Sequence, residues 1–166
     1  MNKKICVVTG SRAEYGLLFC ILNKLSFSKK IDLNIIVTGM HLQKEFGYTI
    51  KNIYDDGFKI KSKIKIHNTN KLNNNVADSI SIGIKKFTKI FYKNKFDLLL
   101  IVGDRYEIFS AAVAATLSHL PIAHIHGGEV TTGAFDESFR HSISKMSHIH
   151  FTSTQTYKNR LIQMGE

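Results

Sequence analysis

The chain has little proline, cysteine and acidic charge, and it has no tryptophan and no long apolar run. A single proline and a hydrophobic content of 43% argue against a disordered protein. No apolar run reaches the roughly 18 residues that a membrane-spanning helix needs. The short apolar run after Met1-Asn2-Lys3-Lys4 lacks the core of a signal peptide. These absences predict one folded domain, over residues 1–166, in the cytoplasm.

The two cysteines, Cys6 and Cys20, fit a reducing compartment. Neither is accompanied by a second pair of metal ligands, so we expect both to be small buried apolar side chains. No His-Glu-x-x-His or paired-cysteine pattern occurs, and therefore no metal is expected.

Acidic residues are outnumbered, 13 against 23 lysines and arginines, which gives a net charge of +10. Such an excess can indicate a nucleic-acid-binding protein. The lysines, however, are spread over 59–65, 85–95 and both termini, which is typical of solvated strand edges and helix faces. We therefore expect no nucleic-acid partner and give more weight to the few arginines, which bind phosphate and carboxylate in bidentate fashion.

Apolar runs alternate with segments of helical periodicity along the whole chain. The pattern predicts strands over 4–9, 33–38, 58–66, 98–102, 122–125 and 148–152. It predicts helices over 14–25, 43–54, 76–92 and 154–164, a further helix after each of the polar loops that follow the 98–102 and 122–125 strands, and a long polar loop over 67–75. Alternation of this kind predicts an α/β fold, a doubly wound three-layer parallel sheet of Rossmann-like type. The 58–66 strand alternates isoleucine with lysine, so it should lie near a sheet edge.

Two of the predicted strands end abruptly in polar clusters. Leu98–Val102 runs into Gly103-Asp104-Arg105-Tyr106-Glu107, and Ile122–Ile125 runs into His126-Gly127-Gly128-Glu129. Asp136, Glu137, Arg140 and His141 follow shortly after. Ligands of open parallel sheets bind where strands end. Gathered carboxylates can raise the pKa of one member, which equips a site for acid and base work on a sugar.

Each of these carboxylates also has a purely structural explanation. Asp104 could simply cap the next helix, as aspartate commonly does. Asp136 and Arg140 stand four residues apart and could pair on a helix surface. We favour a cleft-facing Asp136, because a glycine-containing loop precedes it.

The first strand ends in TGSRAEYG, which is neither G-x-G-x-x-G nor a Walker A loop. No acidic residue follows the second strand, so a nicotinamide dinucleotide is not expected. Arg12 beside a helix N-terminus is either a phosphate contact or a plain surface charge.

Gly127 and Gly128 would let a ligand approach the backbone closely. His41 follows a strand end, so we expect it to line the same cleft. His124 and His126 should point to opposite faces of their strand, which argues against a shared zinc ion.

TGSRAEYG, VTGMH, GDRYEIFSAAVAA and HIHGGEVTTGAFDESFRHSISKMSHIHF together resemble the hydrolysing UDP-N-acetylglucosamine 2-epimerases. That family makes N-acetylmannosamine for sialic acid, and close relatives act on diacetamido sugars. The resemblance implies a GT-B-like fold of two Rossmann-like domains with the active site between them. This chain would be the N-terminal domain, weakly active or inactive alone. It also implies a UDP-sugar substrate, no cofactor, no membrane partner, and a homo-oligomer, a dimer or tetramer.

The resemblance further implies that Asp104 and Asp136 are catalytic carboxylates and that Arg12 contacts the nucleotide diphosphate. Arg140 and His141 would belong to the same site, with Arg105 close by. Many members have glutamate where this chain has His126. The base that starts the reaction is therefore left open between His126, Glu129 and a residue of the second domain.

The implied reaction converts UDP-N-acetylglucosamine and water into N-acetylmannosamine and UDP. It proceeds by elimination through a 2-acetamidoglucal, followed by hydration. Two alternatives remain at this point. One is the acceptor-binding domain of a GT-B-like glycosyltransferase, and the other is a basic Rossmann-like binding module without catalysis.

Overall fold

A computed structural model describes residues 2–67, 76–131 and 136–166. Its six strands form one parallel sheet in the order β3-β2-β1-β4-β5-β6, so the predicted fold class is confirmed. The strands are β1 (Lys3–Thr9), β2 (Ile31–Thr38), β3 (Ile60–Ile64), β4 (Leu98–Val102), β5 (Ile122–Ile125) and β6 (Ile149–Phe151). The alternating strand β3 lies at an edge, as expected. Apart from His67, the predicted polar loop lies outside the described residues.

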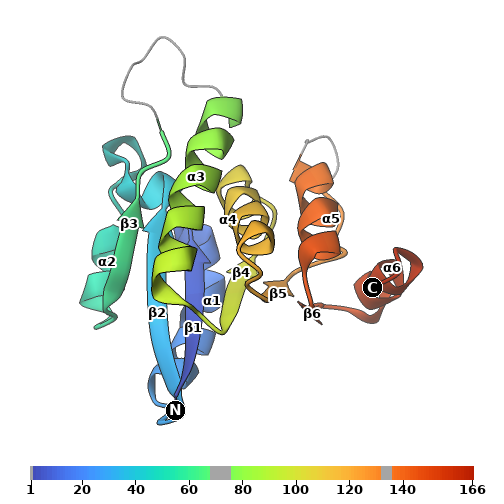
Figure 1. Cartoon of the computed structure of the whole chain (residues 1–166), viewed down its shortest axis with the longest axis horizontal. Coiled ribbons are helices and arrows are strands. Elements are labelled where there is room, and N and C mark those ends of the chain that lie inside the picture. Colours follow the sequence, from blue (N-terminus) through green and yellow to red (C-terminus); the bar gives the residue numbers. More distant parts are fainter. Residues whose placement is uncertain (1, 68–75, 132–135) are drawn as a thin grey trace.

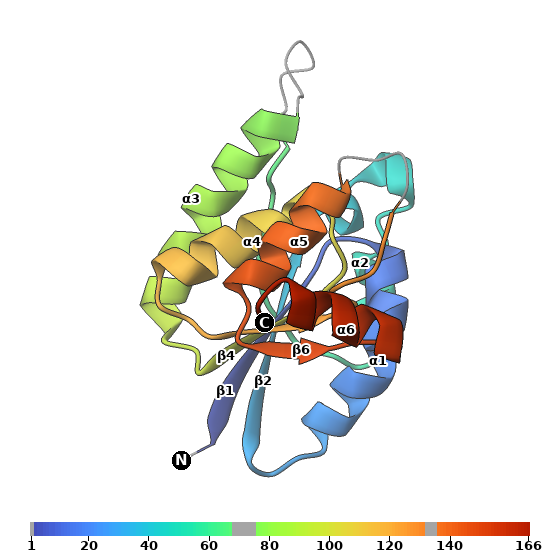
Figure 2. The ribbon, with the colours of Figure 1, turned by 90° about the vertical axis from the view of Figure 1, so that its right-hand side faces the viewer.

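The helices cover the two faces of the sheet separately (Figures 1 and 2). One face carries α3 (Val76–Asn94), α4 (Tyr106–Leu117) and α5 (Asp136–Met146). The opposite face carries α1 (Arg12–Ser26) and α2 (Ile50–Asp55), and α6 (Gln155–Gln163) lies near β6. The predicted three layers are therefore present.

Each face of the sheet has its own hydrophobic core, because successive residues of a strand point to opposite sides. On β1, Cys6 and Val8 pack with Phe87 of α3. The residue between them, Val7, packs with Leu18 and Leu22 of α1 on the other side. The sheet is thus buried over its central strands and presents its strand-end loops along one edge.

Several local expectations are wrong. The predicted helix over 43–54 is instead two 3₁₀ turns, Gly39–Leu42 and Lys44–Phe46, followed by the short helix α2. Gly47 and Tyr48 have positive φ, which interrupts a right-handed helix. The predicted strand 58–66 is shorter, at Ile60–Ile64. Cys20 is exposed on α1, whereas Cys6 is buried as expected.

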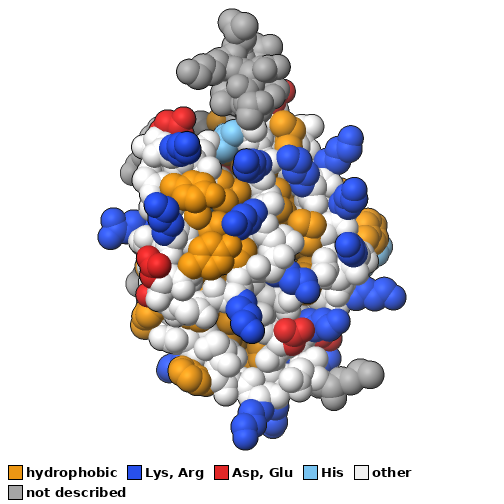
Figure 3. Space-filling view, turned by 90° about the vertical axis from the view of Figure 1, so that its left-hand side faces the viewer, with side chains coloured by type: hydrophobic (Ala, Val, Ile, Leu, Met, Phe, Trp, Pro, Cys, Tyr) orange, Lys and Arg blue, Asp and Glu red, His pale blue; other side chains and the backbone are white. Residues whose placement is uncertain are grey.

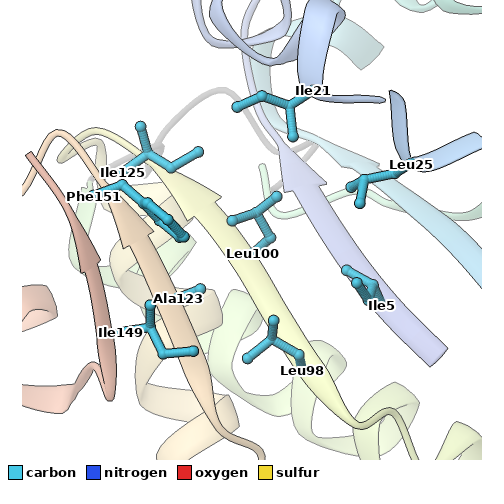
Figure 4. A pocket seen from close by; sticks show the side chains of 9 residues that line it. All are labelled: Ile5, Ile21, Leu25, Leu98, Leu100, Ala123, Ile125, Ile149 and Phe151. Carbon is cyan, nitrogen blue, oxygen red and sulfur yellow. The ribbon is translucent and has the colours of Figure 1, made fainter. Parts of the chain in front are cut away.

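An apolar groove lies on the sheet face beside α1, over β4, β5 and β6 (Figure 4). Its volume is about 400 Å³, and Ile149 and Phe151 of β6 are half exposed within it. The groove is lined by Ile5, Ile21, Leu25, Leu98, Leu100, Ala123, Ile125, Ile149 and Phe151. No helix of the described ranges has the length and apolar character needed to cross a membrane.

The basic charge is dispersed over the surface. Figure 3, which looks onto the side of the molecule with β3 and α2, shows lysine and arginine side chains scattered among apolar and uncharged ones. This distribution agrees with the solvated lysines expected from the sequence.

The crossing of α3 over α4 depends on a glycine. A Cβ atom built on Gly83 would lie 2.8 Å from Cβ of Ser110 on α4. Gly16 on α1, in contrast, has no atom within 4 Å of its Cβ position. The two helical glycines therefore differ in what a methyl group would meet.

Replacing Gly83 by alanine should destabilise the fold by about 1–3 kcal/mol, because overpacking outweighs the better helix propensity of alanine. Replacing Gly16 by alanine should stabilise it by about 0.4–1 kcal/mol. Urea unfolding followed by circular dichroism measures both. Equal responses of the two variants would show that the α3–α4 crossing is not tight.

Candidate functional site

The carboxyl ends of neighbouring strands bring the polar loops together, as the parallel sheet requires. The loop after β1 is joined to the loop after β2 by a hydrogen bond from the amide of His41 to the carbonyl oxygen of Gly10 (3.2 Å). The amide of Gly103, after β4, donates to the carbonyl oxygen of Ile125 at the end of β5 (3.1 Å). Four strand ends are thereby arranged as one edge.

Arg140 of α5 is the centre of the first cluster. Its Nη2 donates to Asp104 Oδ2 in a close ion pair and to Thr131 Oγ1 at 3.0 Å, and its Nη1 donates to the carbonyl oxygen of His126 at 2.8 Å. Nη1 also lies 3.6 Å from Glu129 Oε2. The guanidinium is buried, so its ion pairs are shielded from solvent.

This arrangement excludes both structural explanations considered for the two aspartates. The N-cap of α4 is Arg105, without a side-chain cap bond, so Asp104 does not cap that helix. Arg140 binds Asp104 rather than pairing with Asp136 on the surface of α5. Asp104 is therefore held in the cluster by an arginine that comes from a different element.

His126 and Glu129 form a second close pair at the end of β5. His126 Nδ1 lies 2.5 Å from Glu129 Oε1, which also accepts a hydrogen bond from Ser153 Oγ at 2.8 Å. Burial alone would raise the pKa of Glu129. The hydrogen bonds from Ser153 and His126 and the charge of Arg140 outweigh burial and lower that pKa, so Glu129 is an anion at neutral pH.

The backbone between His126 and Glu129 makes a tight turn. His126 has φ 66°, in the left-handed region, and Gly128 has φ 75°. A Cβ on Gly128 would lie 2.5 Å from the carbonyl oxygen of Tyr157, and one on Gly127 would lie 3.0 Å from Ser144 Oγ. Both glycines are therefore required by packing against α6 and α5. The expectation that they exist to admit a ligand lacks support from the structure.

Arg105, Glu107 and Glu14 form a third group of charges beneath the loops after β1 and β4. Arg105 Nη2 donates to Glu107 Oε1 at 3.0 Å and its Nε to Oε2 at 3.2 Å. Glu107 is fully buried against Gly39, whose added Cβ would lie 2.6 Å from Glu107 Oε1. This bidentate pair fixes the guanidinium of Arg105, which stays one-third exposed.

Glu14 is the carboxyl with the raised pKa, and the sequence analysis did not single it out. Burial first, with the nearby charge of Glu107, raises its pKa from 4.5 to about 8, against the lowering effect of hydrogen bonds from the amides of Gly10 and Ser11 and of nearby Arg105. Glu14 forms a capping box with Ser11 at the start of α1. The S-x-x-E spacing of a capping box was the signal that could have revealed it.

Two histidines expected at or near the site are internal. His41 is fully buried between Thr9 Oγ1 (3.1 Å) and Thr49 Oγ1 (2.7 Å), so the expectation that it lines the cleft is wrong. His124 is also fully buried, with Nε2 2.8 Å from the carbonyl oxygen of Gly103. Burial lowers the pKa of each to about 4, so both are neutral. They tie loops to the core.

The remaining predicted residues are more open. Arg12 opens α1 with an exposed side chain, and Asp136 opens α5 half-buried. His141 lies half-buried on α5, 3.3 Å from Glu137 Oε1. Part of the loop before Asp136 lies outside the described residues. Among those that are described, no three histidine, cysteine, aspartate or glutamate side chains gather to hold a metal ion.

Comparison with known proteins shows which family the sequence of this chain matches. A family model described as UDP-N-acetylglucosamine 2-epimerase matches residues 23–166. The chain is 45% identical over 164 residues to a polysialic acid biosynthesis protein of Escherichia coli, covering 99% of this chain and 42% of that protein. It is 46% identical over 165 residues to GDP/UDP-N,N'-diacetylbacillosamine 2-epimerase (hydrolyzing) of Campylobacter jejuni, covering 99% and 43%. The chain thus spans less than half the length of these relatives.

A crystal structure of UDP-GlcNAc 2-epimerase from Neisseria meningitidis bound to UDP-GlcNAc has the same fold, with a TM-score of 0.86 and 23% identity. The match covers 98% of this chain and 43% of that one. It confirms the predicted relation to one half of a GT-B-like protein.

Replacing Glu14 by glutamine should flatten the pH dependence of stability. Because the folded chain raises the pKa of Glu14, its contribution is complete below about pH 4.5 and is lost as the pH rises through about 8. The wild type should therefore lose stability relative to Glu14→Gln by up to about 1.4 kcal/mol per pH unit in this window. Urea unfolding at several pH values measures the difference. Parallel curves for the two proteins would refute a buried, protonated Glu14.

Proposed function

The chain belongs to the UDP-N-acetylglucosamine 2-epimerase family, and on that premise we propose that it is the N-terminal domain of a hydrolysing sugar-nucleotide 2-epimerase. The observation that carries the proposal is the cluster of Asp104, Arg140, His126 and Glu129 where β4 and β5 end. Relatives at 45–46% identity have names that fit this activity or a pathway that would use it. The second wall of the active site would come from the rest of a longer protein.

The proposed reaction takes UDP-N-acetylglucosamine and water to N-acetylmannosamine and UDP. A base removes the proton at C2 while the C1–O bond to UDP breaks, and the electron pair of the C–H bond forms the C1–C2 double bond of 2-acetamidoglucal. Water then adds its hydroxyl at C1, and a proton adds to the opposite face of C2. Positive charge grows on the ring as UDP departs, and fixed carboxylates stabilise it.

The exposure and the bonding partners of each side chain suggest its role in the proposed reaction. Asp104 and Asp136 supply negative charge near the ring. Arg12, exposed at the N-terminus of α1, and the fixed guanidinium of Arg105 bind the departing diphosphate. Arg140 is occupied by Asp104 and acts by holding it, and His141 borders the same site from α5.

The name of the Campylobacter jejuni relative favours a diacetamido sugar as a second candidate substrate. Proton NMR in D₂O separates the two. The full-length protein is incubated with each nucleotide sugar, and the released sugar is examined at C2. Epimerised sugar with deuterium at C2 identifies the substrate, whereas transfer to an acceptor without epimerisation would assign the fold to a glycosyltransferase.

The proposed substrate and the free cysteines indicate the cellular compartment of the proposed enzyme. A nucleotide sugar and two free cysteines fit the cytoplasm. We further propose a homo-oligomer, a dimer or tetramer.

In the full-length protein, Asp104→Asn should lower turnover at least about a hundredfold, the range for removing one fixed group that stabilises charge in the transition state. The amide removes the charge that faces the reacting ring and is paired with Arg140. Coupled detection of released UDP gives the rate. Asp32→Asn, at an exposed position of β2, is the matched control and should be unaffected. Near-normal activity of Asp104→Asn would remove Asp104 from the mechanism.

The isolated 166-residue chain should show little turnover under the same assay, because it spans less than half of its relatives. Full turnover by this chain would contradict the division of the active site between two domains.

A further inference from the structure

We propose that His126 is the base of the elimination step, with Nε2 as the proton-accepting atom and Glu129 as its positioning residue. This inference rests on the proposed epimerase function and assigns the step that the family resemblance left open. It is argued from four features of the described residues: the His126–Glu129 contact, the local backbone, the charge of the cluster and the engagement of the competing groups.

The contact between the two side chains determines which nitrogen of His126 is free. Glu129 is an anion, since its pKa is lowered, and it can only accept hydrogen bonds. Nδ1 of His126, 2.5 Å from Glu129 Oε1, therefore carries the hydrogen. In a neutral imidazole the lone pair is then on Nε2, which has no hydrogen-bond partner within the described ranges. A carboxylate that orients a histidine in this way leaves a competent base at the far nitrogen.

The backbone holds this histidine in a conformation that side chains rarely adopt. His126 has φ 66°, and its peptide groups are anchored on both sides. Its amide donates to the carbonyl oxygen of Phe151 at 3.0 Å, and its carbonyl oxygen accepts from Arg140 Nη1 at 2.8 Å. Left-handed backbone that is fixed by several bonds is characteristic of functional positions. Here it turns the imidazole back onto Glu129.

The charge of the cluster favours proton uptake at this point. The linked side chains of Asp104, Glu129 and Arg140 together carry a net charge of −1, and Arg160 adds a positive charge at the carbonyl oxygen of Gly128. Positive charge that develops on the imidazole during proton transfer is therefore stabilised by fixed groups.

Other possible bases are engaged or inaccessible. Asp104 Oδ2 is bound by both Arg140 and Thr131. His41 and His124 are fully buried and hydrogen-bonded, and Glu14 is 5% exposed. The side chain of His126, in contrast, is 28% exposed. Asp136, Glu137 and His141 of α5 are also partly exposed at this edge, with Glu137 and His141 paired to each other at 3.3 Å, and Asp136 is included in the test.

The step balances without any further reactant. The proton on C2 moves to His126 Nε2, the electrons of that C–H bond form the C1–C2 double bond, and UDP leaves with the electrons of the C1–O bond. The imidazolium then releases its proton to solvent. Because epimerisation returns a proton to the opposite face of C2, hydration needs a different acid. Loss of His126 should therefore spare the second half-reaction.

The primary variant is His126→Asn in the full-length protein. Asparagine tolerates positive φ, and its amide can still donate to Glu129, but it has no basic nitrogen. We expect UDP release and deuterium incorporation at C2 to fall at least about a hundredfold, with KM unchanged. Hydration of supplied 2-acetamidoglucal should be retained. If Asp136→Asn abolishes the elimination while His126→Asn leaves it intact, the assignment is overturned.

A chemical rescue keeps the test independent of folding. Glycine also accepts φ 66°, and His126→Gly leaves space where the imidazole was. Added imidazole should restore elimination in His126→Gly and not in Asp104→Asn. Absence of rescue, with glucal hydration intact, would contradict a base at this position.

Glu129→Gln tests the positioning role. It should lower kcat and leave KM unchanged, and imidazole should not restore it because His126 is still present. An unchanged kcat would remove Glu129 from the proposal.

If the wild-type protein turns over no nucleotide sugar at all, the proposed function fails and this assignment fails with it. If the wild type is active and His126→Asn equals it, the assignment alone fails.

Discussion

The buried guanidinium of Arg140 is the group on which the strand-end edge depends. It comes from α5, yet its partners are a carboxylate after β4, a carbonyl oxygen after β5 and a second carboxylate in the following loop. Burial of an arginine is costly unless its donors are paired, and here both terminal nitrogens are paired while Nε has no hydrogen-bond partner. Its burial therefore holds Asp104 and the His126 turn in fixed relation, which the sheet alone would not do.

The rest of the edge is fixed by neutral groups that tie loops to the core. His124 contacts the carbonyl oxygen of Gly103 directly before Asp104, and Ser144 of α5 lies 3.3 Å from its other ring nitrogen. Gly127 is small because that histidine and serine occupy the space its Cβ would need. The chemistry-bearing side chains are thus placed by residues that never reach the cleft. Such second-layer support is what gives a polar site a defined geometry.

Much of this arrangement could be predicted from the sequence, because it follows from periodicity. Apolar strands ending at Val102 and Ile125 place Asp104 and His126 on one edge of a parallel sheet, and the structure does so. What could not be predicted depends on backbone dihedrals and on long-range packing. The positive φ of Tyr48 ends a helix that the apolar pattern would continue. His41 follows a strand end as a site residue would, but its burial between two threonines is decided by segments distant in sequence.

Exposure, rather than residue type, separates the carboxylates proposed here to take part in the reaction from the buried ones. Glu107 is fully buried and Glu14 nearly so, and both lie beneath the partly exposed guanidinium of Arg105, which Glu107 holds in place. Asp104 and Glu129 keep side chains that are 16% and 22% exposed, with Arg140 beside both. The sequence shows all four as acids near strand ends, and only the fold separates them. The same criterion separates His126 from His41 and His124, which are entirely enclosed, whereas His126 pairs with Glu129 and still reaches solvent.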